Sequence, residues 1–407
     1  MGFDEELVEA YVALSDLYTK TGLDAEAMAI LDKAGEKAPG SALIKLTLAD
    51  AYAARGDYAT AIVALNDALD AEPENTRTHF RMAQMYRKLG SATDAEAALG
   101  EVISRNPSYP GLALEQGLLL ESTGRLAEAL AAYERALKAT PDDPAAKLRV
   151  GAASIALRDY AKAEPLLAEA VAAMPKAAEA NFYMGELLRL TDRAADSIPY
   201  LRAAVDMDEK NAVYHLRLGM TLMAMHDMTR AMVEVERARA LDPELAEAPL
   251  RVGEIKLRTG SARDAITLFD EALKKDPKLS EAYGLIGEAC EELADFGAAL
   301  RYYQRAVQEL PEDATLNFKL GVTALQTVGP RTALAPLAKA VALVDKPGVD
   351  APAWLPEAYY RLGVLQQASN QKAAALASFK RYLEIAPEKA IDRTEVESRL
   401  EQLMSAS

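Results

Sequence analysis

Small and large apolar residues recur along this chain at a fixed spacing of 34 residues. The stretch from Gly253 to Pro277 shows the pattern clearly, with Gly253, Ala265 and Phe269 in that order, and similar residues stand 34 positions before and after each of them. No strand-like alternation of apolar and polar residues is seen. The pattern therefore predicts an almost entirely helical chain built from one repeated unit.

The 34-residue frame runs without insertion or deletion through ten copies, and an eleventh follows after eight extra residues. Position fifteen of the frame is often Gly, which suits the left-handed end of a helix, and the frame usually closes with Pro, which cannot continue one. Each copy is therefore predicted to be two helices joined by a turn. The copies begin at Val8, Ala42, Thr76, Pro110, Pro144, Ala178, Ala212, Ala246, Ser280, Ala314 and Pro356.

Position eight of the frame is small in every copy and glycine in eight of them. Glycine inside a helix costs roughly 0.5–1 kcal/mol relative to alanine, so its recurrence needs a packing reason. We expect the two helices of a repeat to approach closely here, through a small residue at position twenty and a larger one at position twenty-four, such as Ala265 and Phe269. Pro165, Pro199 and Pro336 fall early in second helices, where we expect distorted first turns rather than breaks.

This frame resembles the tetratricopeptide repeat family from about Val8 to Lys389. The resemblance implies an all-α, right-handed superhelical solenoid of helix–turn–helix repeats. The resulting division is a lead-in over 1–7, ten repeats over 8–347, an insertion loop over 348–355, an eleventh repeat over 356–389 and a C-terminal capping helix over 390–407.

The composition of the chain limits the classes of partner and the compartments that can be expected. The net charge of −16 argues against sequence-independent nucleic-acid binding and favours basic or neutral partners. No apolar run is long enough to cross a membrane, and the acidic start of the chain lacks a signal core. We expect a cytoplasmic protein without direct membrane insertion; the alternative is a periplasmic protein or outer-membrane lipoprotein whose leader was removed.

Candidate chemistry is sparse. The three histidines lie far apart in the frame, no nucleophile and base share a motif, and no glycine-rich phosphate loop follows a strand. We therefore predict no enzyme activity, no metal and no cofactor.

The resemblance also implies that first helices line a concave groove through frame positions two, five, six, nine, twelve and thirteen. The third repeat is basic there, repeats four to seven are mostly apolar, and repeats eight and nine are acidic. The partner-binding residues predicted in this groove are Arg77, Phe80, Arg81, Leu114, Leu118, Leu148, Ile155, Phe182, Leu216, Met220, Met223, Glu254, Glu288 and Glu292.

Two interpretations of the apolar stripe stay open. Superhelical winding can bury it between neighbouring first helices, or it can receive an amphipathic helix or extended apolar segment. The two-carboxylate clamp of chaperone adaptors is matched only in its third part, by Arg77 and Arg81. Val12, Asp16 and Thr47 do not match its first two parts, so we do not predict the chaperone tail as a ligand. Arginines at position six, such as Arg149 and Arg251, could instead bind partner carboxylates.

The sequence thus favours a non-enzymatic adaptor that holds a peptide or helix of a partner protein. The alternatives are a structural subunit that self-assembles or helps to assemble an envelope, pilus or secretion complex, and a subunit that positions a separate enzyme. The single tryptophan, Trp354, lies in the insertion; it either packs in the joint before the last repeat or is an exposed anchor.

Overall fold

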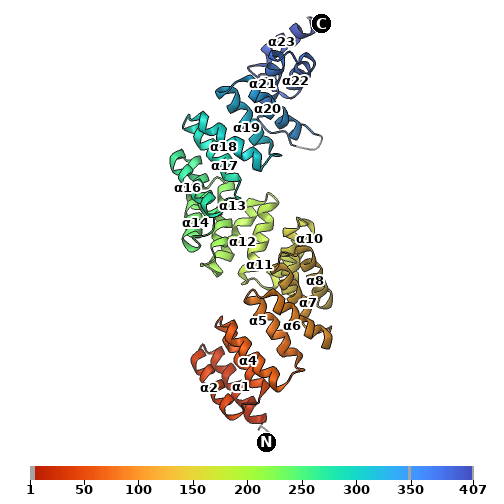
Figure 1. Ribbon diagram of the computed structural model, residues 1–407, viewed down its shortest axis with the longest axis vertical. Coiled ribbons are helices and arrows are strands. Elements are labelled where there is room, and N and C mark those ends of the chain that lie inside the picture. Colours follow the sequence, from red (N-terminus) through yellow and green to blue (C-terminus); the bar gives the residue numbers. More distant parts are fainter. Residues whose placement is uncertain (1–4, 347–349, 406–407) are drawn as a thin grey trace. The chain divides into compact units, whose positions relative to one another are not determined.

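The structure, a computed structural model, describes residues 5–346 and 350–405. Within them the chain forms 23 helices and no strand (Figure 1), which confirms the predicted all-α fold. The predicted lead-in, insertion loop and capping helix each lie partly outside the described residues.

The helices cluster into two compact units, Met1–Met207 and Asp208–Ser407, and each is described by itself. Unit 1 contains α1 (Glu5–Lys20), α2 (Asp24–Lys37), α3 (Ala42–Ala54), α4 (Tyr58–Ala71), α5 (Thr76–Lys88), α6 (Ala92–Arg105), α7 (Leu112–Ser122), α8 (Leu126–Ala139), α9 (Pro144–Ala156), α10 (Tyr160–Ala173), α11 (Ala178–Leu190) and α12 (Ala194–Met207). Unit 2 contains α13 (Ala212–Ala224), α14 (Met228–Leu241), α15 (Glu247–Arg258), α16 (Ala262–Lys275), α17 (Glu281–Glu292), α18 (Phe296–Glu309), α19 (Ala314–Thr327), α20 (Pro330–Val344), α21 (Leu355–Ala368), α22 (Lys372–Ile385) and α23 (Arg393–Ser405).

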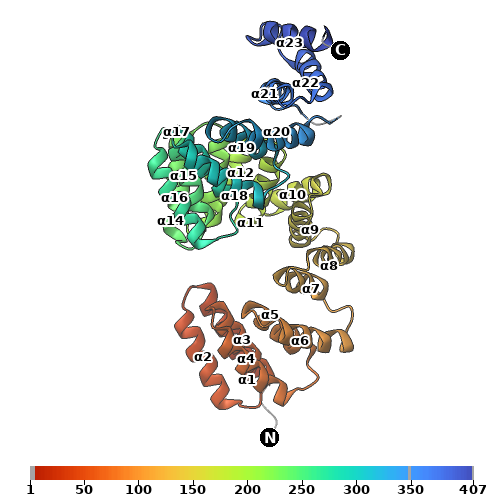
Figure 2. The same ribbon diagram turned by 45° about the horizontal axis from the view of Figure 1, so that its top comes forward.

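Odd-numbered helices up to α21 are the first helices of the repeats, and even-numbered helices are the second. Within each unit a first helix packs on the second helix that follows it, and that second helix packs on the next first helix. Figures 1 and 2 show such pairs, for example α5 with α6 and α21 with α22, side by side from two directions. Each repeat therefore shares its apolar faces with its neighbours in sequence, as in other repeat arrays.

The glycines at frame position eight hold the two helices of a repeat together. A Cβ atom added to Gly151 would lie 2.6 Å from Cγ of Leu167, and one added to Gly253 would lie 2.6 Å from Cε1 of Phe269. Both partner side chains are fully buried. The close approach predicted from position eight is confirmed.

The turn takes a left-handed backbone conformation in ten of the eleven repeats; in the tenth, Val328 has a φ of −112°. Gly56, Gly90 and Gly260 have φ between 78° and 80° in this turn. Five repeats adopt the same conformation with a residue other than glycine, at φ of 58–62°: Arg158, Asp192, His226, Ala294 and Asn370. Packing of the paired helices thus imposes the turn even where the local sequence does not favour it.

A polar side chain at frame position four fastens several first helices to the loop before them. Each one is within hydrogen-bond distance (3.0–3.2 Å) of the carbonyl oxygen of the residue six positions earlier: His79, Asn181, His215 and Asn317. His79 and His215 therefore have structural partners, and His226 lies in a turn.

Second helices tolerate their early prolines. α10, α12 and α20 run without a break through Pro165, Pro199 and Pro336. This agrees with the prediction that these prolines do not end the helices.

The described part of the insertion packs against unit 2. The ring of half-buried Trp354 stacks on Phe318, with centroids 4.7 Å apart and planes 9° apart, and its indole N–H donates to Oγ1 of Thr315 at 3.4 Å. The packing interpretation therefore describes Trp354. Beyond the last repeat, α23 packs on α22 with Val396 fully buried.

Candidate functional site

The first helices form the inner side of each unit. Successive first helices contact one another directly, as α1 and α3, α5 and α7, and α9 and α11 do in unit 1, and α13, α15 and α17 do in unit 2. Among the described residues, successive second helices make no contact of comparable extent. Because the first helices are the closer set, their free faces are taken as the inner surface of each unit.

Part of the predicted apolar groove is buried within this surface. Leu148 and Ile155 belong to one core cluster of unit 1, and Leu216 and Met223 are likewise buried. Packing between helices is therefore the interpretation that describes these four side chains. Contact with a ligand stays a prediction for the apolar groove positions that are half-buried, which are Leu114, Leu118, Phe182 and Met220.

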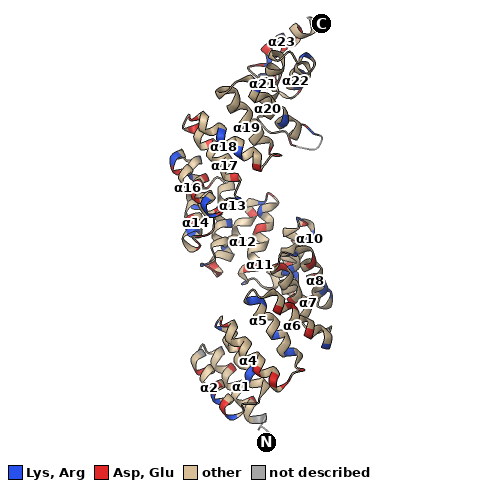
Figure 3. Ribbon diagram, in the orientation of Figure 1, with Lys and Arg blue, Asp and Glu red and all other residues tan. Residues whose placement is uncertain are grey.

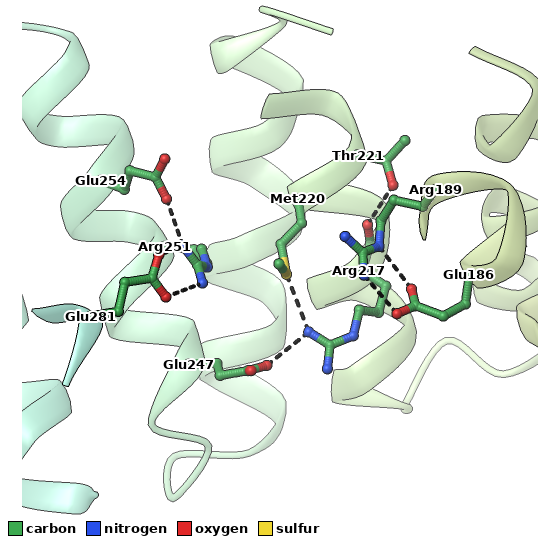
Figure 4. A network of polar contacts seen from close by, with 9 residues as sticks. All are labelled: Glu186, Arg189, Arg217, Met220, Thr221, Glu247, Arg251, Glu254 and Glu281. Atoms are coloured by element: carbon green, nitrogen blue, oxygen red, sulfur yellow. Dashed lines mark hydrogen bonds and ion pairs between the residues drawn. The ribbon is translucent and has the colours of Figure 1, made fainter. Parts of the chain in front are cut away.

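In unit 2 two arginines at frame position six, Arg217 and Arg251, bind glutamates of the following repeat (Figure 4). Arg217 donates to Glu247 at 2.8 Å, and Arg251 donates through both terminal nitrogens to Glu281 at 2.8 Å. Arg251 also donates to Glu254 on its own helix at 2.8 Å. Position six thus pairs with the residue thirty positions later, which ties neighbouring first helices together.

The predicted acidic residues of unit 2 are mostly partnered by this chain. Glu254 binds Arg258 as well as Arg251, and Glu288 lies 2.5 Å from Nζ of Lys319. Glu292 is exposed and has no ion pair within 4.0 Å in the described part of the chain. Since each ion pair neutralises a carboxylate, the acidic stretch is less negative toward a ligand than its sequence suggests.

In unit 1 the same inner surface is basic on α5, which carries four basic and no acidic residues (Figure 3). Arg87 is committed to packing, because its Nε lies 2.5 Å from Oε1 of the buried Glu115. Arg81 is held by Asp50, 3.2 Å from its Nε, and by Gln84, to which it donates at 3.0 Å. These contacts fix the arginine side chains rather than leaving them mobile.

Asp50 is the acidic residue of this surface with a perturbed titration. Burial raises the pKa of the Asp50 carboxyl above its usual value, while the positive charges of Arg81 and Arg77 act against that rise. Asp50 is thus a costly place for a negative charge, and Arg81 stabilises it.

Arg77 and Phe80 remain as the open part of the surface. Arg77 is exposed and has no ion pair within 4.0 Å among the described residues, and the same holds for Lys88. Phe80 is half-buried, one helical turn from Arg77, and its ring lies against Tyr109 with centroids 5.0 Å apart. An exposed cation beside an aromatic face is suited to a carboxylate with an apolar neighbour.

Sequence reasoning missed the partners of these side chains. Asp50, Glu115 and Tyr109 were not among the predicted site residues, although the first two decide which arginines are free. The spacing of thirty residues between an arginine and a glutamate, as in Arg149 and Glu179, is a signal for the pairs made at position six. It does not apply to Arg87 and Glu115, which are 28 residues apart, or to Arg81, whose partner Asp50 precedes it.

The described residues contain no group of three or more His, Cys, Asp or Glu side chains placed to hold a metal ion. Among them there is also no helix that is both long and apolar enough to cross a bilayer.

Sequence models described as tetratricopeptide repeats match residues 21–77, 80–144, 152–212, 216–280, 250–314 and 356–389, and one of these models alone covers more than half of the chain. The chain belongs to the tetratricopeptide repeat family. Members of this family are typically non-enzymatic scaffolds for protein interactions. No curated protein matches the chain by sequence.

Several solved structures are similar to this chain at low identity. The human IFIT1 dimer with m7Gppp-AAAA is 16% identical, with 86% of this tetratricopeptide repeat chain and 91% of that chain covered, at a TM-score of 0.52. The yeast Tom70 structure is 16% identical over 99% of this chain and 97% of that chain, at a TM-score of 0.45. YrrB, described as a TPR protein with an unusual peptide-binding site, is 22% identical over 46% of this chain and 95% of that chain, at a TM-score of 0.37.

Proposed function

We propose that this tetratricopeptide repeat protein is a non-enzymatic adaptor and that the inner surface of unit 1 binds a segment of a partner protein. The observation that carries the proposal is the exposed guanidinium of Arg77, which has no ion pair among the described residues, next to the half-buried ring of Phe80. Arg81 and Arg87 of the same surface are used internally, and of the two cations that are left, Arg77 and Lys88, Arg77 is the one that lies one helical turn from Phe80.

The segment we propose carries an acidic residue close to an aromatic or aliphatic one. The carboxylate would accept hydrogen bonds from Arg77, and the apolar side chain would lie on Phe80 and Tyr109. Leu114 and Leu118, both half-buried on the next first helix, extend the apolar contact. Arg81 would contribute positive charge while remaining bound to Asp50.

The proposal does not include the stripe around Leu148, because a buried side chain cannot contact a ligand without a rearrangement of the core. It also excludes Glu254 and Glu288 as selectors of basic residues, since their carboxylates already bind basic side chains of this chain. The groove residues proposed here are therefore fewer than the sequence alone predicts.

Selection from a random peptide library tests the proposal. Peptides selected on the wild-type chain should be enriched in Asp or Glu beside an apolar residue, and Arg77→Glu should shift the enrichment toward Lys or Arg. The matched control is Arg202→Glu, an exposed arginine on the second helix α12 of the same unit. Circular dichroism should show that both variants are folded.

Selection of the same peptides by wild type and Arg77→Glu would show that the surface around Arg77 does not bind them. A second variant, Phe80→Ala, separates charge from apolar contact, because it should weaken binding of every selected peptide without altering the charge preference. Arg77→Glu removes a charged hydrogen bond to the peptide carboxylate, so it should weaken binding of the acidic peptides by about 2 kcal/mol, or roughly 30-fold in affinity.

A further inference from the structure

An open apolar cleft lies between the third and fourth repeats, and neither Arg77 nor Phe80 is among its lining residues. It has a volume of about 180 Å³ and is bounded by α6, α7 and α8. Leu99, Leu119 and Leu120 line it, together with Ile103, which is 38% exposed. At the same frame position in most other repeats the apolar residue is buried or half-buried, as Leu137 and Val205 are. The joint between these repeats is therefore incompletely filled.

Two departures from the repeat pattern produce the cleft. Frame position seven is a large apolar residue in the other ten repeats, and Gln116 replaces it here; the apolar residues are Leu14, Leu48, Met82, Val150, Met184, Leu218, Val252, Ile286, Leu320 and Leu362. Gly100 lies in the middle of α6, and a Cβ added to it would meet no atom within 4 Å. Unlike Gly151, Gly100 has no packing reason, although glycine weakens the helix.

The size and charge of the cleft define what it can take. A cavity of about 150 Å³ is enough to hold a benzene molecule, whereas ligand pockets usually exceed about 300 Å³, so this cleft suits one aliphatic side chain. Two charged residues line it: Glu96, whose carboxylate already lies 3.3 Å from Nη1 of Arg125, and Arg135, whose guanidinium donates to Oε1 of the neutral Gln116 at 3.1 Å. Arg135 has no ion pair within 4.0 Å in the described part of the chain. A carboxylate beside the aliphatic side chain would supply one.

The chain itself presents this combination. Ile391 is 97% exposed, in the turn between α22 and α23, and Asp392 follows it directly. Single exposed apolar residues are common on proteins, but a β-branched side chain almost wholly in water, next to an acid, matches the cleft in both shape and charge.

We propose that the cleft of one copy receives Ile391 of a second copy, with Asp392 paired to Arg135. Cleft and turn are different patches, so the contact is heterologous, and each copy offers both halves of it. A contact centred on one side chain buries far less than a standard interface of about 1,600 Å², so association should be weak and dependent on concentration. This contact does not use Arg77 or Phe80 and is independent of the proposed adaptor function.

Sedimentation velocity of the full chain, from micromolar to millimolar concentration, tests the proposal. Wild type should show a rising mean mass, and Ile391→Asp and Gly100→Leu should each weaken the association by about 10- to 100-fold, because each removes the burial of one aliphatic side chain. Arg135→Glu should weaken it less. The matched controls are Val63→Asp, at another exposed apolar position, and Arg237→Glu, at the same frame position as Arg135.

The decisive measurement is made on a mixture of Gly100→Leu and Ile391→Asp, the two variants that should not associate alone. Gly100→Leu retains an intact turn and Ile391→Asp retains an intact cleft, so the mixture should form one-to-one pairs that cannot extend, although neither variant associates alone. Pairing would also show that both variants are folded. A wild type that stays monomeric at all concentrations, or variants that associate as wild type does, would overturn the proposal.

Discussion

On α5 of unit 1 and on α15 and α17 of unit 2, the inner surface uses the same frame positions for charge, yet the described residues left without an ion pair there carry opposite charges. In unit 2, Arg217 and Arg251 at position six bind glutamates of the following repeat, and the exposed carboxylate without an ion pair is Glu292. In unit 1, Arg81 and Arg87 are bound by acidic residues, and the exposed cation beside an aromatic ring is Arg77. A charged residue at a lining position therefore indicates a binding site only when no residue of the chain neutralises it.

A second difference concerns burial. The pair formed by Arg87 and Glu115 in unit 1 has side chains that are 16% and 5% exposed, whereas Lys319 and Glu288 in unit 2 are 26% and 38% exposed. Water screens the exposed pair and only partly reaches the buried one. Pairs that look alike in sequence should therefore differ greatly in their importance to stability.

The largest expected effect concerns the stability contributed by the buried and the exposed ion pair. Arg87→Ala should lower the free energy of unfolding by about 3–5 kcal/mol, because it leaves the Glu115 carboxylate buried without a partner, and Lys319→Ala should cost at most about 1 kcal/mol. Urea unfolding followed by far-UV circular dichroism gives both values. Fluorescence of Trp354, the single tryptophan, reports on unit 2 and should change less for Arg87→Ala. Equal losses for the two variants would show that burial does not separate the pairs.

A smaller effect compares two helical glycines of unit 1. Gly151→Ala should destabilise the chain by about 1–3 kcal/mol, because the added methyl group collides with Leu167. Gly100→Ala should stabilise it by roughly 0.5–1 kcal/mol, because nothing lies within 4 Å and alanine favours the helix. Thermal unfolding of the two variants beside wild type measures both. If Gly100→Ala also destabilises, the cleft next to it is not open in solution.

The smallest effect is a difference in pH dependence between the units. Hydrogen bonds from Arg381, and then from Tyr359, lower the pKa of Asp345 in unit 2, so its contribution is present above the unfolded pKa near 4 and is lost as the pH falls through the lower folded value. Burial raises the pKa of Asp50 in unit 1, so the folded state binds the proton more tightly and stability falls as the pH rises from about 4 through the raised value.

Urea unfolding at several pH values between 3 and 7 measures this contrast. Asp345→Asn should remove part of the acid-induced loss seen by Trp354 fluorescence, and Asp50→Asn should remove part of the loss seen by circular dichroism as the pH rises. For each variant, the difference in unfolding free energy between wild type and variant is plotted against pH. If the two differences change with pH in the same direction, the assignment of opposite pKa shifts is wrong.

Much of the fold could be predicted because the residues that pack the two helices together recur at the same frame positions in every repeat. Gly151 and Leu167 stand at fixed frame positions, and the structure places them against each other. The candidate site was predicted less well. Leu148 and Met223 have the residue type of a groove lining and are buried, whereas Leu114 and Phe182, of the same type, are half-buried. Exposure depends on how closely neighbouring first helices approach, and no single frame position encodes that distance.

The repeat, its two helices, the close contact between them and the family all follow from the amino-acid sequence alone. These features are local or follow from a period of 34 residues, so residue type at each position is enough to specify them. The three-dimensional arrangement was needed to see which charges are used internally, as for Arg87, and where the joint between repeats stays open, as beside Gly100. Both depend on side chains that meet from different repeats in three dimensions, where ion pairing and filling of space are settled by distances of a few ångströms.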